Sequence, residues 1–397
     1  MDSRTKLSIL LMSGCQALMN STTSIMISSA ALVSLLLLGD DKSLATVPVT
    51  AVVTGTALMT IPASLFMRRV GRKAGFLFGA FIGMIGAAIC SYSIVVSNFW
   101  GFVFGAMFVG MYTAFGNYYR FAAVDVAGIQ HRSKAVSYVL AGGLIAGFLG
   151  PQIASHSKDL FAPHTYLGPY LAIIILGLLA MILISFVSIP KMSTIEHDEN
   201  QRPLLEIARQ PTFIVAVLSA MIGFGVMSLV MTATPLAMIG CGHLYSDSFN
   251  VISWHVVAMY GPSFFTGSLI SRFGEYKIIF VGALLGVCSV IVSLMGLDLA
   301  NFYIALVLLG LSWNFMFIGG TTLVTTTYRP SETAKVQGLN DFMVFGTVAT
   351  ASLMSGQLQE HFGWEVVNLG ALPLLFVVIV LTVWNITKTA RVRTAAE

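Results

Sequence analysis

The polar side chains that could bind a solute are few, and they stand inside long apolar runs of the sequence. Gln16 and Asn20 are four residues apart and would share one face of a helix. Trp313 and Asn314 are adjacent within another run, where Trp is unusual because it prefers membrane interfaces. Three further candidates are Tyr112, Asn117 and Thr232. Each could contact a solute or could instead bond or pack within the protein, and the sequence leaves both alternatives open.

Ionisable residues inside the apolar runs are rarer, and each has a structural alternative. Arg120 stands near the end of a run, where it could draw in an anion or extend its guanidinium to the membrane surface. His255 could titrate near neutral pH or sit at an interface. Asp341 could carry a coupling proton, or it could cap and latch the end of its helix.

The composition requires that lipid, rather than water, surrounds most of the chain. Of its 397 residues, 56% are hydrophobic and 10% are charged, and the mean hydropathy is +0.86. A water-soluble domain carries about 25% charged residues, which this chain does not have. The net charge of +4 comes with no run of basic and aromatic residues, which argues against nucleic acid as a partner.

The sequence lacks the patterns of an enzyme or a metal centre. The four cysteines are widely separated, and no pair has CxxC or other metal-ligand spacing. There is no GxxxxGKS loop, so we do not expect ATP to drive the protein directly. We therefore expect no catalytic residues, no bound metal and no cofactor.

The apolar runs predict an all-α integral membrane protein with twelve transmembrane helices, since a bilayer core needs about 20 apolar residues per helix. The predicted helices span 8–38, 46–67, 74–96, 99–122, 135–155, 166–189, 213–236, 251–271, 278–297, 301–326, 337–357 and 366–387. With the N-terminus in the cytoplasm, 19 of the 21 Lys and Arg residues fall on or near the inner side, the exceptions being Lys42 and Lys158. Both termini are therefore predicted to be cytoplasmic.

A hydrophilic break at 191–211 divides the chain into two predicted domains, 1–190 and 212–397. The stretch from 204 to 209 could form a short amphipathic helix on the inner membrane surface, or the whole break could be a solvated linker. Each predicted domain holds six of the predicted helices.

The two halves repeat at an offset of 203 residues. This offset aligns Arg69 with Arg272 and Gly71 with Gly274 in the loops after the second and eighth predicted helices. It also carries Arg132, after the fourth predicted helix, onto a basic residue after the tenth. Two loops in one register indicate a duplication, which is how many transporter folds are assembled.

These loops resemble the signature of the major facilitator superfamily, which has glycines, an acidic residue and basic residues between helices two and three. Arg69 and Arg72 match its basic positions in the first half, and Arg272 matches in the second. The resemblance implies that these residues belong to a charge network that latches the halves together on the inner side.

Both copies depart from the family pattern at its acidic position. Arg68 stands there in the first half and Ser271 in the second. Asp125, at the end of the fourth predicted helix, or Asp341, near the start of the eleventh, could supply the missing acid to the arginines of the first loop.

The resemblance implies a fold of two six-helix halves related by pseudo-two-fold symmetry, with a central cavity lined by helices one, four, seven and ten. The candidate binding residues on these helices are neutral amides and aromatics, which suit an uncharged or amphiphilic solute, such as a vitamin or a siderophore-like chelate. The segments 119–123 and 234–238 are similar to those of bacterial members of the family, some of which are thought to move riboflavin. No acid stands at mid-depth of these four helices, so the driving ion stays open, with protons as a candidate.

The function that follows is secondary active transport of a small organic solute across a bacterial inner membrane, by a protein that we expect to be a monomer. A proton-coupled efflux pump for drugs or metabolites is the alternative. It is favoured by Gly142, Ala146, Gly150 and Pro151, which are similar to a motif of the family's proton-coupled exporters. A membrane receptor without transport is a third hypothesis, which the internal repeat argues against.

Overall fold

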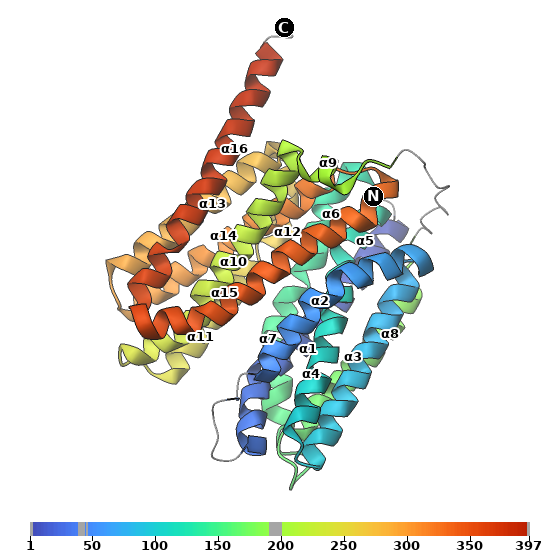
Figure 1. Ribbon diagram of the computed structural model, residues 1–397, viewed down its shortest axis with the longest axis vertical. Helices are drawn as coiled ribbons and strands as arrows, with labels where there is room; N and C mark the ends of the chain where they lie inside the picture. The colour runs from blue at the N-terminus through green and yellow to red at the C-terminus, as the bar shows by residue number, and fades with distance from the viewer. Residues whose placement is uncertain (1–2, 39–43, 45–46, 190–200, 395–397) are drawn as a thin grey trace. The chain divides into compact units, whose positions relative to one another are not determined.

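The computed structural model describes residues 3–38, 44, 47–189 and 201–394, and every regular element in these stretches is a helix. The helices gather into two compact units (Figure 1). The first unit comprises Met1–His131, Tyr138–Glu199 and Gln337–Phe342, and the second comprises Arg132–Ser137, Asn200–Val336 and Met343–Glu397.

Each unit contains one short segment from the other half of the sequence. The second unit takes Arg132–Ser137, and the first takes Gln337–Phe342. Adding the offset of 203 to the first segment gives 335–340, which overlaps the second segment by four residues. The predicted linker, 191–211, lies where the chain passes from the first unit to the second, and its residues 191–200 lie outside the described residues. The predicted domain boundaries therefore stay a prediction.

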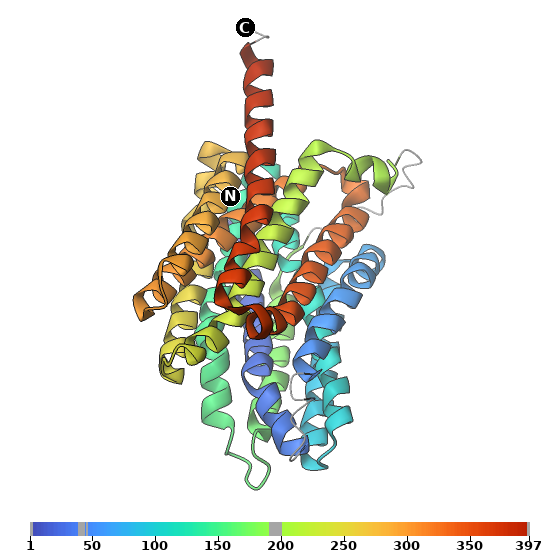
Figure 2. The same ribbon diagram turned by 60° about the vertical axis from the view of Figure 1, so that its left-hand side comes forward.

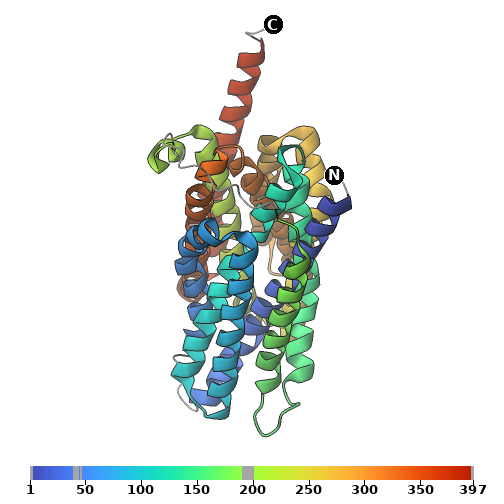
Figure 3. The same cartoon turned by 90° about the vertical axis from the view of Figure 1, so that its right-hand side faces the viewer.

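The long helices of the first unit lie side by side (Figure 3). The long helices are α1 (Ser3–Leu38), α2 (Val47–Val70), α3 (Arg72–Val95), α4 (Phe99–Gly116), α7 (Gly143–Ser157) and α8 (Leu167–Phe186). The unit also contains the short helix α5 (Tyr119–Ala127), the end of α6 (Arg132–Ala141) and the short turn η1 (Ile129–His131). Small residues let their backbones approach closely. A Cβ atom on Gly110 of α4 would stand 2.0 Å from the carbonyl oxygen of Val52 on α2.

The second unit has a comparable set of helices. They are α9 (Leu204–Ala208), α10 (Pro211–Gly240), α11 (Tyr245–Tyr260), α12 (Ser263–Phe273), α13 (Glu275–Met295), α14 (Leu299–Val324), α15 (Thr333–Leu369) and α16 (Ala371–Thr394), with the turn η2 (Pro330–Glu332). The last turns of α16 extend past the other helices of this unit (Figure 2). The short helix α9 lies where the sequence allows either an amphipathic helix or a solvated linker, and its Ile207 is buried.

Ten helices in the described part of the chain are long and apolar enough to cross a membrane. The eighth predicted span is broken at Gly261 and Pro262 into α11 and α12, each of which is shorter than 18 residues. The eleventh and twelfth predicted spans fall within one candidate span, Pro330–Thr387, which contains α15 with its kink at Gly363 and most of α16. The all-α membrane fold is therefore confirmed, whereas the number twelve and the pseudo-two-fold symmetry stay predictions.

The duplicated loops share an unusual backbone conformation. Gly71, which precedes α3, has φ 91° and ψ 154°, and Gly274, which precedes α13, has φ 88° and ψ 156°. A positive φ of this size is strained for any residue with a Cβ atom. Both positions therefore require glycine for the same reason, at the alignment that the 203-residue offset predicts.

We expect Gly71→Ala and Gly274→Ala each to destabilise the protein by about 1–2 kcal/mol, because alanine tolerates left-handed φ poorly. Space is not the cause, since no atom lies within 4 Å of a Cβ built at either site. Gly346→Ala, in the helical part of α15 with equally open surroundings, is the matched control and should be neutral or slightly stabilising. Thermal unfolding in detergent measures the differences. Equal melting temperatures for Gly274→Ala and Gly346→Ala would contradict the strain argument.

Candidate functional site

The predicted coupling residues Arg120 and Asp341 form a buried ion pair within the first unit. Arg120 Nη2 lies 2.6 Å from Asp341 Oδ1, and the two side chains are 2% and 0% exposed. The same carboxylate oxygen accepts a hydrogen bond of 2.8 Å from the amide of Asn340. Asp341 Oδ2 is also buried, and no described residue donates a hydrogen bond to it. Two charges buried to this degree depend on each other, because either one alone would be strongly destabilising.

A second ion pair lies at the start of α3. Arg72 directly follows Gly71, and its Nε lies 2.5 Å from Asp125 Oδ2 at the end of α5. Its Nη2 donates to the side-chain oxygen of Gln337 at 3.0 Å. Arg69, by contrast, is exposed. Of the two acids that could compensate for the missing one, Asp125 contacts the arginine of this loop.

The equivalent position in the second unit has the opposite charge. Glu275 follows Gly274 as Arg72 follows Gly71, and Arg132 Nη2 lies 2.8 Å from its carboxylate. The predicted gating residue Arg272 is exposed, and its guanidinium lies 5.3 Å from the centre of the Phe273 ring. The sequence prediction missed the Arg132–Glu275 pair. The 203-residue offset aligns Glu275 with Arg72 and so indicates a charged position there, but it does not indicate the partner.

Another ion pair that the sequence prediction missed holds the end of the linker. The Arg202 guanidinium donates to both carboxylate oxygens of Glu332, at 2.9 and 2.6 Å, and Lys335 donates to the Arg202 backbone carbonyl. Hydrogen bonding to Glu332 raises the pKa of Arg202 above its usual value. Glu332 is fully buried at the start of α15, so the end of the linker and the start of this helix are joined.

The amides predicted to bind solute in the first half lie where α1 and α4 touch. Thr23 and Thr113 join the two helices, with 3.2 Å between their hydroxyl oxygens. Asn20 and Gln16 follow at about one and two turns from Thr23 on α1, and Gln16 Nε2 donates to Asn20 Oδ1 at 3.1 Å. Asn117, just past α4, is 7% exposed, and its amide nitrogen has no hydrogen-bond partner among the described residues. We call Gln16, Asn20 and Asn117 the amide cluster.

Tyr112 does not share the face of α4 that carries Thr113 and Asn117. Its side chain packs on Gly83 of α3, where a Cβ atom would stand 2.7 Å from the Tyr112 ring. Its hydroxyl is buried near that of Tyr119, but the two do not form a well-aligned hydrogen bond. The location of Tyr112 favours the core of the first unit over the amide cluster.

Trp313 lies in a group of aromatic rings in the second unit. We call this group the aromatic cluster, and it consists of Phe224, Tyr260, Trp313, Phe317 and Phe345. The Trp313 ring is nearly parallel to that of Phe317, with 5.1 Å between centroids, and edge-on to Tyr260 at 5.3 Å. Trp313 is 1% exposed, and its Nε1 has no hydrogen-bond partner among the described residues. A buried indole N–H usually has a hydrogen-bond partner, so this unpaired donor is unusual.

Asn314 differs from its neighbour because its amide is fully used by the protein. Its Oδ1 accepts from Thr266 at 2.6 Å, and its Nδ2 donates to the Met259 carbonyl and to the Ser263 hydroxyl at 2.6 and 2.7 Å. These partners flank the break at Pro262, where proline removes a backbone donor. Asn314 therefore stabilises the junction of α11 and α12.

Thr232 and His255 are in contrasting surroundings. Thr232, on α10, is partly exposed. His255, on α11, is fully buried, and its Nδ1 lies 2.7 Å from the Leu306 carbonyl oxygen, so this nitrogen carries a proton. Its Nε2 is buried without a hydrogen-bond partner in the described part of the protein. This location is a helix interface rather than the membrane surface.

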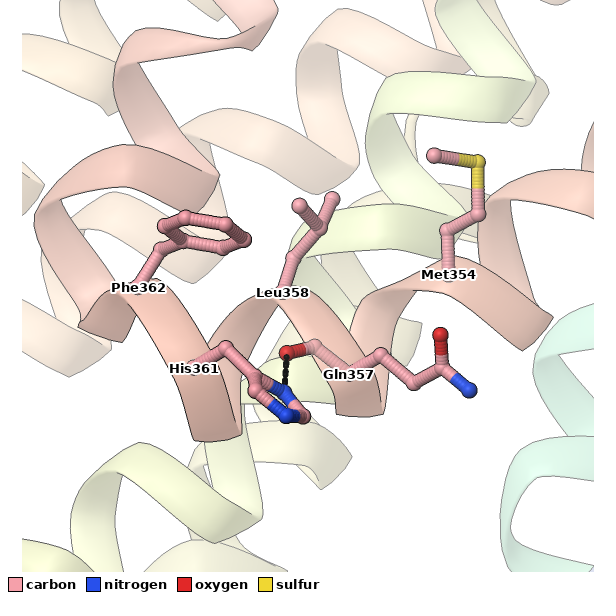
Figure 4. Close-up of a pocket in the computed structure, with 5 residues that line it drawn as sticks. All are labelled: Met354, Gln357, Leu358, His361 and Phe362. Atoms are coloured by element: carbon pink, nitrogen blue, oxygen red, sulfur yellow. Dashed lines mark hydrogen bonds between the residues drawn. The ribbon is translucent and has the colours of Figure 1, made fainter.

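A surface hollow lies near the end of α15 (Figure 4). Its lining side chains are Met354, Gln357, Leu358, His361 and Phe362, all from that one helix. The His361 ring bonds only to the backbone of its own helix, at the Gln357 carbonyl oxygen. The hollow has no charged pair and no convergent polar groups from a second element. Within the described residues, no group of three or more His, Cys, Asp or Glu is arranged to hold a metal ion.

Comparisons with known proteins agree on one family. The model of the Major Facilitator Superfamily matches residues 9–343 and 248–396. The riboflavin transporter RfnT of Brucella anthropi is 40% identical over 375 residues, which cover 94% of each chain. An MFS-type transporter of Bacillus subtilis, YddS, is 26% identical over 361 residues, covering 87% of this chain and 83% of that one.

Solved structures of low sequence identity share the fold. The transporter FucP superposes with a TM-score of 0.75 at 18% identity, covering 95% of this chain and 98% of that one. The human organic anion transporter MFSD10 gives 0.76 at 12% identity, covering 96% and 100%. The family that the duplicated loops resemble is therefore confirmed, and this multi-pass membrane protein belongs to the major facilitator superfamily.

Proposed function

We propose that this protein is a secondary transporter of riboflavin or a closely related flavin. The observation that carries the proposal is the 40% identity with a riboflavin transporter across 94% of both chains. Identity of this extent leaves few insertions or deletions, so the helices that bind the solute are expected to be shared.

The aromatic cluster supports a flat aromatic solute. Phe224 and Tyr260 are partly exposed, whereas Trp313 and Phe317 lie buried behind them. An isoalloxazine ring could stack on the exposed aromatic faces and accept a hydrogen bond from Trp313 Nε1 at one of its carbonyl oxygens.

The ion pair of Arg120 and Asp341 is the proposed coupling element, with protons as the coupling ion. The pair joins residues 221 positions apart, on α5 and α15, and α15 passes into the second unit at Met343. Protonation of Asp341 would remove its attraction for Arg120 and so free this segment of α15 to move during alternating access. The unpartnered Oδ2 of Asp341 is a site at which a proton could be received.

Uptake into the cell is proposed over export. The glycines that suggest an exporter pack closely on α1. A Cβ atom at Gly142 would stand 2.2 Å from the Ser13 carbonyl oxygen, and one at Gly150 would stand 2.4 Å from Ser24 Cβ. Close packing therefore accounts for these glycines without a role in export. We further propose that the protein is a monomer in the bacterial inner membrane. Both termini are proposed to lie in the cytoplasm, as the distribution of Lys and Arg favours.

Binding measurements on the purified protein test the proposed substrate class. Riboflavin is expected to raise the melting temperature of the protein, and its own fluorescence is expected to fall on binding. A ferric siderophore and a lipophilic cationic drug are not expected to raise the melting temperature. A drug that binds while riboflavin does not would favour the efflux alternative. Stabilisation by none of the three would contradict the proposed substrate class.

A further inference from the structure

The amide cluster lies against α4 at a contact that runs along two antiparallel helices. Thr23 meets Thr113, and Met19 packs on Gly116, where a Cβ atom would stand 2.7 Å from Met19 Cγ. The chain therefore runs in opposite directions in the two helices, so that lower residue numbers on α1 lie opposite higher residue numbers on α4. Continuing this register places Asn117 opposite the turn of α1 that lies between Asn20 and Gln16, which share one face of that helix.

Two atoms of the amide cluster are buried without partners, and they are of opposite type. Gln16 is 4% exposed; its Nε2 donates to Asn20, but its Oε1 accepts no hydrogen bond from the described residues. Asn117 is 7% exposed, and its Nδ2 donates none. One acceptor and one donor thus stand unpaired on facing helices. Buried polar atoms are seldom left unpaired, so this pair marks a ligand position.

The neighbouring polar groups do not satisfy these atoms. Thr23 and Thr113 bond to each other and to their own helices. Arg120, the charged residue nearest to Gln16 along α5, is paired with Asp341. The amides themselves are uncharged. A neutral group with one donor and one acceptor would satisfy both atoms, and an N–H beside a carbonyl is such a group.

We propose that the amide cluster binds the imide edge of the transported solute, with Gln16 accepting from its N–H and Asn117 donating to the adjacent carbonyl. This inference rests on the proposed function, because the isoalloxazine ring of riboflavin has such an edge, an imide N–H flanked by two carbonyls. The two side chains would then determine specificity for flavins over flat aromatics that lack the imide.

The test compares riboflavin with a derivative methylated at the imide nitrogen, which cannot donate to Gln16. Wild-type protein is expected to bind the methylated derivative about tenfold more weakly, as expected for one lost hydrogen bond. Gln16→Met removes the acceptor at similar size, so this variant should bind both flavins with equal, weakened affinity. Asn117→Leu should weaken both flavins while keeping the preference for riboflavin. Ser21→Ala, a buried hydroxyl on α1 that bonds only to its own helix, is the matched control and should behave as wild type.

The outcomes separate this inference from the proposed function. If Gln16→Met still binds riboflavin more tightly than the methylated derivative, the imide assignment is wrong, while the proposed function stands. Riboflavin binding that Asn117→Leu leaves at wild-type strength also overturns it. Failure of folded wild-type protein to bind riboflavin overturns the proposed function and this inference with it.

Discussion

Arg120→Gln and Asp341→Asn are each expected to lower the free energy of unfolding by about 3–5 kcal/mol, because each leaves a buried charge without its partner. The double variant removes both charges and should recover much of that loss. The reason is the near-complete burial of both side chains, with 2.6 Å between their charged atoms. Thermal unfolding in detergent measures all three variants. Arg69→Gln, which removes an exposed arginine, is the control and should change stability little.

Transport by the same variants distinguishes a coupling role from a structural one. If the pair couples proton movement to transport, the double variant will be stable yet unable to accumulate solute against its gradient. Full accumulation by the double variant would assign the pair to stability alone. A double variant that is no more stable than the less stable of the two single variants would contradict the ion-pair explanation itself.

Trp313→Ala should have the second large effect, on both stability and binding. Removing a buried indole from the aromatic cluster leaves a cavity, which costs about 3–5 kcal/mol, and removes the ring and donor proposed for the flavin. Trp313→Phe separates these effects, since it keeps most of the aromatic packing and loses only the Nε1 donor. Its stability should fall by less than about 1.5 kcal/mol, and its affinity for riboflavin by about tenfold.

The control for this series is Trp254→Phe, because Trp254 is 58% exposed on α11. This variant should match wild type in melting temperature and in riboflavin affinity. Wild-type affinity in Trp313→Phe would show that Nε1 does not contact the solute. A small stability loss in Trp313→Ala would mean that the cluster is loosely packed.

The sequence predicted the fold class and the family because these depend on properties that are visible along the chain. Long apolar runs, sided basic residues and two loops in one register need no knowledge of distances. The positive φ at Gly71 and Gly274 gives the repeated loops a common physical requirement. The break at Pro262 could also have been expected, since proline and the preceding glycine interrupt an apolar run there.

The partners of the charged residues could not be predicted in the same way. Asp125 and Asp341 were equal candidates for the arginines after α2, because both fall at helix ends. The structure separates them, since Asp125 contacts Arg72 and Asp341 contacts Arg120. The decision depends on which residues of α15 pack within the first unit, and no local pattern in the sequence carries that information.

Neighbouring candidates in the sequence also proved to have different surroundings. Trp313 and Asn314 are adjacent on α14, yet the indole nitrogen is unpaired while the amide holds the break beside Pro262. Adjacent helical residues point about 100° apart, so their environments are independent. Tyr112 likewise lies one residue from Thr113 but packs on α3. The helix that carries each of these residues could be predicted from the apolar runs, but the direction of each side chain could not.

Uptake of radiolabelled riboflavin by proteoliposomes containing the purified protein tests the central proposal most directly. We expect saturable uptake that excess unlabelled riboflavin abolishes and that a pH gradient drives above equilibrium. Proteoliposomes with the Arg120→Gln/Asp341→Asn variant should not accumulate riboflavin. Uptake no greater than that of protein-free liposomes, by protein that remains folded and correctly inserted, would contradict it.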